Sequence, residues 1–242
     1  MKILCVADTE SRELWDFWST AGRRLTEGVS LILSAGDLKH DYLEFLVTML
    51  CVPCLYVRGN HDTGYKNDPP GGCICIEDRA VRITEDPLTG DAILMDIDSS
   101  LRMRGSAGRG SGRIITVAGL GGSMRYHDGP DMYTEKEMRR RVKRLARRMK
   151  LRSALCRTCD AKDGDAADVR ILLTHAPGFG HGDLEDLPHR GFECFNDLIG
   201  TWQPDLHLYG HVHMEYGNFE RVTHHPDGTE LINVSGMYIL EV

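Results

Sequence analysis

The sequence of 242 residues has no long hydrophobic run, and its aromatic content is only 7%. No stretch approaches the roughly eighteen consecutive apolar residues that a membrane-spanning helix needs. The first apolar run, residues 3–7, stops at Asp8, which is too early for the hydrophobic region of a secretory signal peptide. We therefore expect a cytoplasmic protein that has no membrane partner.

Cysteines in the spacing of a zinc site are also lacking. Two CxxC pairs, 51/54 and 156/159, occur among the eight cysteines, but about a hundred residues separate them. A zinc site usually brings two such pairs within about twenty residues of each other. Cys54 also opens the apolar run 54–57, which predicts a small buried side chain. We expect neither a structural zinc nor, in a reducing compartment, a disulfide.

Charge is present but unevenly distributed. The net charge is −7, yet residues 135–152 hold ten Lys or Arg and two Glu, a local balance of +8, so the remainder carries −15. The same segment has a stripe of apolar residues on one helical face: Met138, Val142, Leu145 and Met149. We predict a basic amphipathic helix at about 134–152. A solvated outer face is the simpler interpretation, and a surface that attracts anions is the alternative.

Short apolar runs alternate with helical patterns along the chain, which indicates an α/β architecture. The predicted strands cover residues 3–7, 31–34, 54–57, 92–97, 114–118, 171–173, 206–209 and 231–234. The predicted helices cover residues 13–20, 42–50, 134–151 and 192–199. The Gly-, Ser- and Arg-rich residues 104–113 indicate a loop. No linker, repeat or change in composition divides the chain, so we expect residues 1–242 to form a single domain.

Side chains that bind metals follow five of these predicted strands. Carboxylate, amide or imidazole groups come directly after each apolar run, and glycines beside several of them allow sharp turns. These residues are Asp8 and Glu10, then Asp37, then Asn60 with His61 and Asp62, then His175, and finally His211 with His213. Open α/β sheets bind their ligands at the carboxyl ends of strands.

The spacing of these residues fits divalent metal ions. Residues two apart in an extended chain point the same way, so Asp8 and Glu10 would leave the sheet side by side. Two neighbouring carboxylates repel each other unless a positive group separates them. Oxygen and imidazole ligands favour Mn, Mg or Fe. This many ligands suit two ions that share Asp37 better than they suit one tetrahedral ion.

The order of the motifs resembles the calcineurin-like metallophosphoesterase family. The matching elements are GD at 36–37, GNHD at 59–62, the histidine at 175 and GHVH at 210–213. Together with Asp8 they span nearly the whole chain. The resemblance implies a four-layer αββα sandwich, in which helices flank two mixed β-sheets. It also implies a metallophosphoesterase, a hydrolase that uses two divalent metal ions to cleave phosphate esters.

The resemblance also implies which residues bind each ion. One ion would be bound by Asp8, Glu10, Asp37 and His213, and the other by Asp37, Asn60, His175 and His211. The family usually has histidine where this sequence has Glu10. A glutamate ligand adds negative charge, which favours Mn or Mg over Zn; the alternative is that Glu10 points away and the first ion is weakly held. Mn is the expected metal, and Mg, Fe and Zn are the alternatives.

The resemblance extends to the chemistry. Two metal ions would generate a bridging hydroxide that attacks phosphorus in line. His61 resembles the family's catalytic histidine, which stabilises developing charge or protonates the leaving oxygen, and Asp62 is its expected partner. His181, in the loop after His175, and Arg125, after another predicted strand, are candidates for substrate binding. Hydrogen bonding within their loops is an equally simple role for both.

These features predict a phosphoesterase that acts on a small phosphate-ester substrate, more specifically a phosphodiesterase. A nuclease is one alternative, because the basic segment could follow a phosphate backbone. Nucleic acid is nevertheless not the favoured partner, since no aromatic residues interleave the arginines. A protein-binding scaffold weakened in catalysis by Glu10 is the second alternative, and the intact His61 argues against it. The sequence leaves the oligomeric state open.

Overall fold

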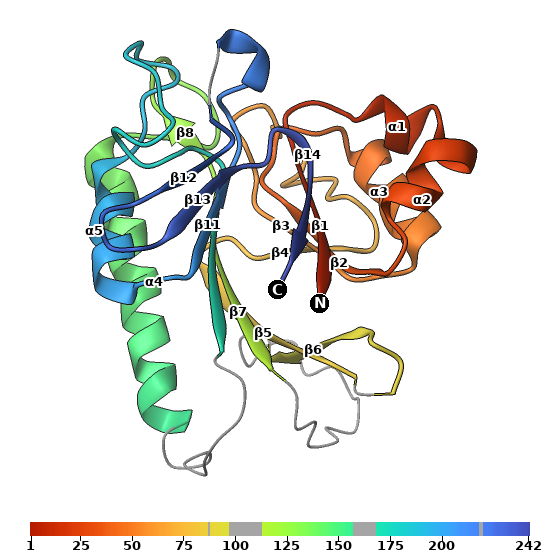
Figure 1. The fold of residues 1–242 in the computed structure, drawn as a ribbon. Helices are drawn as coiled ribbons and strands as arrows, with labels where there is room; N and C mark the ends of the chain where they lie inside the picture. Colours follow the sequence, from red (N-terminus) through yellow and green to blue (C-terminus); the bar gives the residue numbers. More distant parts are fainter. Residues whose placement is uncertain (87, 97–112, 157–167, 218–219) are drawn as a thin grey trace.

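Two β-sheets pack face to face, and helices cover the outer face of each (Figure 1). The computed structural model describes residues 1–86, 88–96, 113–156, 168–217 and 220–242. Residues 104–112 of the predicted loop, and Cys159, lie outside the described residues. The predicted four-layer αββα sandwich of two mixed sheets is confirmed.

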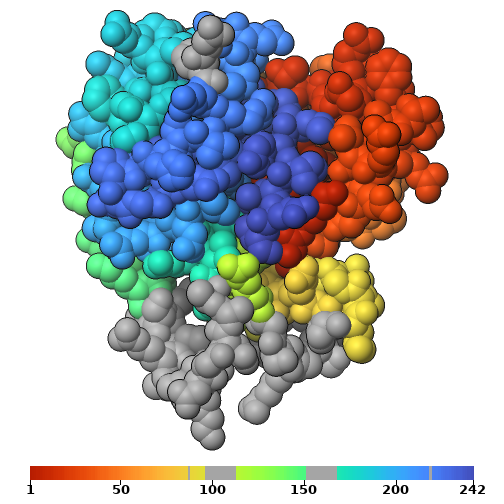
Figure 2. Space-filling model, in the orientation of Figure 1, coloured from red at the N-terminus to blue at the C-terminus, as the bar shows by residue number. Residues whose placement is uncertain are grey.

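The first sheet joins the N-terminal strands to the last strand of the chain. Its order is β14-β1-β2-β3-β4, with β14 antiparallel to β1 and the other neighbours parallel. The strands are β1 Lys2–Ala7, β2 Val29–Ser34, β3 Cys54–Tyr56, β4 Cys73–Cys75 and β14 Gly236–Glu241. The two ends of the chain therefore lie side by side (Figure 1), and the Met1 amino group donates to the Val242 carbonyl oxygen at 2.6 Å. Figure 2 shows the blue C-terminal residues lying against the red N-terminal ones.

The second sheet is larger and takes its strands from the middle and the C-terminal part of the chain. Its order is β12-β13-β11-β10-β7-β5-β6. The four central strands β13, β11, β10 and β7 run parallel, and the flanking strands are antiparallel. The bounds are β5 Arg79–Glu85, β6 Ala92–Asp96, β7 Ile114–Leu120, β10 Val169–Thr174, β11 Leu206–Tyr209, β12 Val222–His224 and β13 Glu230–Asn233. A separate small sheet pairs β8 Ser123–Met124 with β9 Met132–Tyr133.

Helices from the N-terminal part cover the first sheet, and α4 and α5 cover the second (Figure 1). Their bounds are α1 Arg12–Trp15, α2 Arg23–Leu25, α3 His40–Leu50, α4 Glu135–Cys156 and α5 Glu193–Trp202, with a π-helical turn η1 Trp18–Gly22 and a 3-10 turn η2 Met214–Tyr216. The continuous helix predicted at 13–20 is wrong. Phe17 leaves the helical region of the backbone, with φ −113° and ψ 30°, so α1 ends before η1 begins. Within the described residues, no helix has both the length and the hydropathy that crossing a membrane requires.

The strands are apolar on both faces because each sheet is covered on both sides. In β1, Ile3 and Cys5 face the layer between the sheets, and Leu4 and Val6 face the helices. This alternation follows from the two-residue period of a strand. Cys54 is fully buried in the outer cluster, which confirms the expected core position.

The layers bring the ends of distant strands together. Strands β1, β2 and β3 are parallel in one sheet, and β10 and β11 are parallel in the other. The residues that follow these five strands include every candidate metal ligand. The site lies where these carboxyl ends meet, which is the usual ligand-binding edge of such sheets.

Candidate metal centre

Three candidate ligands have an unusual backbone conformation. Asp8, Asp37 and His211 have φ angles of 61°, 56° and 70°, in the left-handed region that residues other than glycine rarely adopt. Each such conformation costs about 1–3 kcal/mol and persists where the surrounding structure enforces it, often at functional sites. Asp8 is fixed partly by the hydrogen bond from its amide to the Gly36 carbonyl oxygen at 3.0 Å. The chain turns sharply at the end of each strand and presents these side chains to one region.

Two glycines allow the loops to approach the candidate ligands closely. A Cβ atom on Gly59 would lie 2.0 Å from Asp37 Oδ1 and 2.6 Å from His175 Cε1. A Cβ atom on Gly210 would lie 2.7 Å from Asp8 Oδ2. Both distances to oxygen are far below van der Waals contact, so neither position accepts a side chain without displacing a carboxylate. The packing around the site therefore depends on these glycines.

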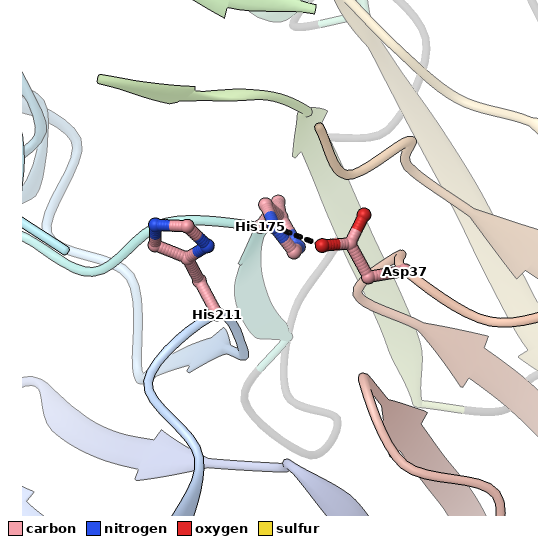
Figure 3. A group of neighbouring side chains, drawn as sticks. All are labelled: Asp37, His175 and His211. Atoms are coloured by element: carbon pink, nitrogen blue, oxygen red, sulfur yellow. Dashed lines mark ion pairs between the residues drawn. The ribbon is translucent and has the colours of Figure 1, made fainter. Parts of the chain in front are cut away.

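Four side chains form the densest part of the site. The ligand atoms of Asp37, His175 and His211 all lie within 4.8 Å of one another, and Figure 3 shows the three side chains converging, with Asp37 joined to His175. His175 Nε2 lies 3.2 Å from Asp37 Oδ2 and 3.1 Å from Asn60 Oδ1. We call Asp37, Asn60, His175 and His211 the compact half of the centre.

Backbone carbonyl groups orient both imidazoles of the compact half. His175 donates from Nδ1 to the Ala35 carbonyl oxygen at 2.8 Å, which leaves Nε2 to face Asp37 and Asn60. His211 donates from Nε2 to the Pro188 carbonyl oxygen at 2.7 Å, which leaves Nδ1. Metal-binding histidines usually donate their second ring N–H to a carbonyl or carboxylate in this way.

The charges in the compact half favour a cation there. Burial opposes the charged forms of both His175 and Asp37, but their mutual attraction outweighs it. That attraction raises the pKa of His175 to about 9 and lowers the pKa of Asp37 to about 2. Burial, together with the neighbouring charge of His175, lowers the pKa of His211 to about 3. The lone pairs of the Asp37 carboxylate, the Asn60 amide oxygen and the His211 imidazole point to one region. A positive charge there stabilises them, and either a proton on His175 or a divalent ion can supply it. The residues present fit the metal that the motifs imply.

The remaining candidate ligands, Asp8, Glu10 and His213, have contacts that differ from those of the compact half, and we call them the open half. The two oxygens of Asp8 accept a hydrogen bond from the His211 amide at 2.9 and 3.0 Å, and burial raises the pKa of Asp8. Glu10 Oε1 forms an ion pair with Lys39 Nζ at 3.3 Å. His213 stacks on Tyr216, with ring centroids 4.9 Å apart.

His61 and Asp62 have distinct positions in the GNHD loop. His61 is exposed, and its backbone amide donates to Asp37 Oδ1 at 2.7 Å. Asp62 is buried, and its Oδ2 accepts from the amides of Asp37 at 2.9 Å and Gly59 at 2.8 Å. Within the described residues, the Asp62 carboxylate has no hydrogen bond to the His61 imidazole. The contacts of Asp62 are those of a residue that fixes the turns carrying Asp37 and Asn60.

The two candidates for substrate binding lie against other groups. The Arg125 guanidinium contacts Glu137 Oε2 at 3.1 Å and donates to the Met132 carbonyl oxygen at 3.2 Å. The His181 ring lies 4.8 Å from the ring of His225, centroid to centroid, and burial lowers its pKa. In the part of the chain that the structure describes, neither side chain contacts the compact half.

The structure adds residues to the site that the motifs did not single out. The carbonyl groups of Ala35 and Pro188 orient the two imidazoles. His189 places its ring 5.3 Å from that of His211 and contacts Asp186 Oδ2 through Nδ1 at 2.7 Å. Backbone carbonyls give no sequence signal. His189 could be found from the sequence, because it lies in the long loop that follows His175.

Known proteins resemble this chain in sequence. A family model described as calcineurin-like phosphoesterase matches residues 1–215. A curated relative, UPF0046 protein T07D4.2 of Caenorhabditis elegans, is 40% identical over 53 residues, which cover 21% of this chain and 13% of that protein. The chain thus matches only a small part of that relative's length.

A solved structure shows the same fold. This crystal structure aligns with 99% of the present chain over 94% of its own length, at 14% identity and a TM-score of 0.56. The crystal structure of TT1561 of Thermus thermophilus aligns with 97% of this chain and 89% of its own, at 15% identity and a TM-score of 0.49. A hypothetical protein from the same organism aligns with 98% of this chain and 77% of its own, at 13% identity and a TM-score of 0.47.

Proposed function

The chain belongs to the calcineurin-like phosphoesterases, and we propose that it is a metal-dependent phosphodiesterase whose centre holds two divalent ions. The convergence of Asp37, Asn60, His175 and His211 carries this proposal, because their ligand atoms lie close enough together to share one cation. In this proposal the compact half binds one ion, the open half binds the other, and Asp37 is shared. Divalent ions bound there supply Lewis-acid activation of water and of a phosphoryl oxygen.

The side chains around the ligands have separate tasks in this proposal. His61 is exposed at the edge of the centre and attached through its amide to Asp37. One of its ring nitrogens would deliver a proton to the leaving oxygen as the ester bond breaks. Asp62 would keep the loops of Asp37 and Asn60 at a fixed separation through its two backbone hydrogen bonds. The proton donor and the positioning residue are therefore neighbours in the sequence with different roles.

The charges near the site favour a diester over a monoester. A phosphate diester carries one negative charge, whereas a monoester carries nearly two at neutral pH. Arg125, one of the two candidates for substrate binding, is already paired with Glu137. A paired cation offers less compensation for a second negative charge. A small phosphodiester therefore suits the described surroundings best, and Mn is the proposed metal, since the oxygen-rich ligand set is hard.

Hydrolysis of chromogenic esters tests the proposal. Protein stripped with a chelator is assayed on a chromogenic phosphodiester and on the matching monoester, before and after addition of Mn, Mg or Zn. Hydrolysis that appears only with metal, fastest with Mn and faster on the diester, is the expected result. Metal-dependent hydrolysis that is faster on the monoester would support a metal-dependent phosphoesterase but contradict the proposed preference for diesters. Absence of hydrolysis with every metal, in protein that binds Mn, would contradict the enzymatic proposal.

One observation supports a second candidate function, a binding protein weakened in catalysis. Glu10 is engaged by Lys39, so its carboxylate already has a positive partner other than a metal. If the open half binds no ion in solution, the chain would retain the fold and one metal without rapid turnover. Glu10→His separates the candidates, because metal-dependent activity gained by this variant indicates an enzyme limited at one ligand.

A further inference from the structure

The outer face of α4 carries a row of five exposed cationic side chains. Their spacings of four, three, four and three residues place them on one side of the helix. They are Lys136, Arg140, Lys143, Arg147 and Lys150, and together they form what we call the basic ridge. At 1.5 Å per residue the ridge is about 21 Å long. The opposite side of α4 carries the buried stripe predicted from the sequence, so only the outer face is available.

The ridge differs from Arg139 and Arg141 of the same helix, which form ion pairs. Arg139 contacts Glu135 and Asp197, and Arg141 contacts Glu77 at 3.3 Å. Within the described residues, no member of the ridge forms an ion pair. No acidic residue follows Glu137 in α4, so nothing on the helix interrupts the positive charge.

The unpaired row works against the stability of the helix. Like charges four residues apart cost about 0.2–0.5 kcal/mol for each pair, and the ridge contains two such pairs, Lys136 with Arg140 and Lys143 with Arg147. The rest of the chain carries a net negative charge, yet its acidic groups do not reach the ridge within the described residues. An external polyanion would relieve this repulsion.

The chemistry of the ridge narrows the class of polyanion. A helix that binds a membrane surface inserts apolar residues beside its cations, but the apolar stripe of α4 is buried against the body. A groove for single-stranded nucleic acid offers aromatic rings for base stacking, and α4 has no exposed large hydrophobic side chain among its described residues. Duplex nucleic acid needs only cations that follow its phosphates.

We propose that the basic ridge binds the phosphate backbone of duplex nucleic acid without reading its sequence. An α-helix is about 10–12 Å wide and the major groove of B-DNA about 12 Å, so a free helix could enter the groove. Here the body of the protein occupies the inner side of α4. The outer row therefore contacts phosphates, which position a protein but carry no sequence information. This binding goes beyond the proposed hydrolysis and does not depend on it.

Salt dependence of binding tests the proposal. Fluorescence anisotropy of a labelled duplex of about 20 base pairs of DNA is measured with the full chain between about 50 and 200 mM salt, with an RNA duplex of the same sequence as a second arm. Five phosphate contacts predict that log K falls against log salt with a slope of about −4.5, which corresponds to about a 500-fold loss of affinity over this range. A DNA of unrelated sequence should bind equally well. A slope near zero would overturn the proposal without any variant.

A matched pair of variants locates the contact. Lys143→Gln with Arg147→Gln removes two ridge charges, and should weaken binding at about 50 mM salt at least about tenfold and bring the slope to about −2.7. Arg23→Gln with Arg24→Gln removes two exposed charges from α2 and should leave binding unchanged. Hydrolysis of the small diester should be the same in both variants and the wild type, which separates this surface from the metal centre. Equal binding by the two variants would overturn the assignment to α4.

Competitors distinguish the kinds of anion. The labelled duplex is displaced with unlabelled duplex, single-stranded DNA, polyglutamate and vesicles that contain phosphatidylserine. Displacement by duplex at concentrations at least tenfold lower than by the other three supports the proposal. Equal displacement by polyglutamate would assign the ridge to acidic proteins, and preference for single strands or vesicles would likewise overturn it.

Discussion

The compact half and the open half of the metal centre differ in what their side chains already contact. In the compact half, backbone carbonyls fix both imidazoles and leave one lone pair of each for a cation. In the open half, Glu10 is paired with Lys39 and His213 stacks on Tyr216. An ion that binds the compact half replaces the proton on His175 among ligands that already converge, whereas an ion that binds the open half must separate Glu10 from Lys39 and His213 from Tyr216. Preorganisation of this kind lowers the cost of binding, so we expect the two halves to bind metal with unequal affinity.

The largest expected effect comes from a variant at His61, which should separate metal binding from diester hydrolysis. His61→Ala removes the proposed proton donor but keeps the amide that binds Asp37, so diester hydrolysis should fall about 10²- to 10⁴-fold. The content of bound metal, measured by mass spectrometry after gel filtration, should stay unchanged. Loss of metal and activity together would show that His61 supports the compact half instead of the reaction.

Gly59→Ala should displace the Asp37 carboxylate and so disrupt the compact half. The added Cβ would lie 2.0 Å from Asp37 Oδ1, so the carboxylate must move away from His175. A displacement of about 1 Å costs about 10²-fold in rate, and bound metal should fall as well. Gly64→Ala is the matched control, because a Cβ there meets nothing within 4 Å. Equal metal content and activity in both variants would contradict the close approach on which the compact half depends.

Glu10→His should narrow the difference between the halves. In the wild type we expect Mn titration, followed by calorimetry or electron paramagnetic resonance, to show one tight ion and a second bound at least about tenfold more weakly. The histidine removes the partner of Lys39 and should tighten the second ion about tenfold, in the range seen for contacts around metal ligands. Lys39→Ala frees Glu10 and should tighten the same ion by a smaller factor. Two equal ions in the wild type would remove the distinction between the halves.

The smallest expected effect concerns His207, which contacts Thr174, the residue before His175. Burial, reinforced by His181 and His225, lowers the pKa of His207 to about 3, and His207 Nε2 lies 2.8 Å from Thr174 Oγ1. The folded-state pKa lies below the unfolded value of about 6.5, so the folded protein resists protonation. The contribution to stability is complete above about pH 6.5 and is lost as the pH falls toward about 3.

Denaturant unfolding at several pH values tests this dependence. From about pH 7 to about pH 5.5, the contribution of His207 should lower the free energy of unfolding by about 1 kcal/mol. His207→Gln removes the titrating group, so the pH dependence should be flatter by that amount in the variant. The difference between the two proteins isolates His207 from the other histidines. Identical pH dependence would show that His207 does not titrate in this range.

Much of the fold was predictable from local patterns. The runs that became β1, β2, β3, β10 and β11 are apolar on both faces because the sandwich covers them on both sides. The strands that the sequence did not reveal are short, such as β4 and β8, or lie partly exposed, such as β14. These strands are defined by hydrogen bonds to neighbouring strands, and such pairing leaves a weaker pattern in the sequence than burial does. The helix predicted at 13–20 was wrong because the backbone breaks at Phe17.

The sequence by itself determined which side chains arrive at the strand ends. A strand that ends one to three residues before Asp8, Asp37 or His175 delivers that residue to the carboxyl edge of its sheet. The order of the motifs was therefore enough to identify the family and to name the candidate ligands. The residue pattern of segment 135–152 was also enough to predict a helix with a basic outer face and an apolar inner face.

Only the tertiary structure decided how those side chains share their contacts. The pairing of Glu10 with Lys39, the carbonyls that hold His175 and His211, and the absence of ion pairs along the described basic ridge each depend on groups from separate elements. Such contacts depend on distances of a few ångströms between segments far apart in the sequence, and no local pattern encodes them. Periodicity fixes where a residue lies on its own element, whereas packing between elements fixes what that residue touches.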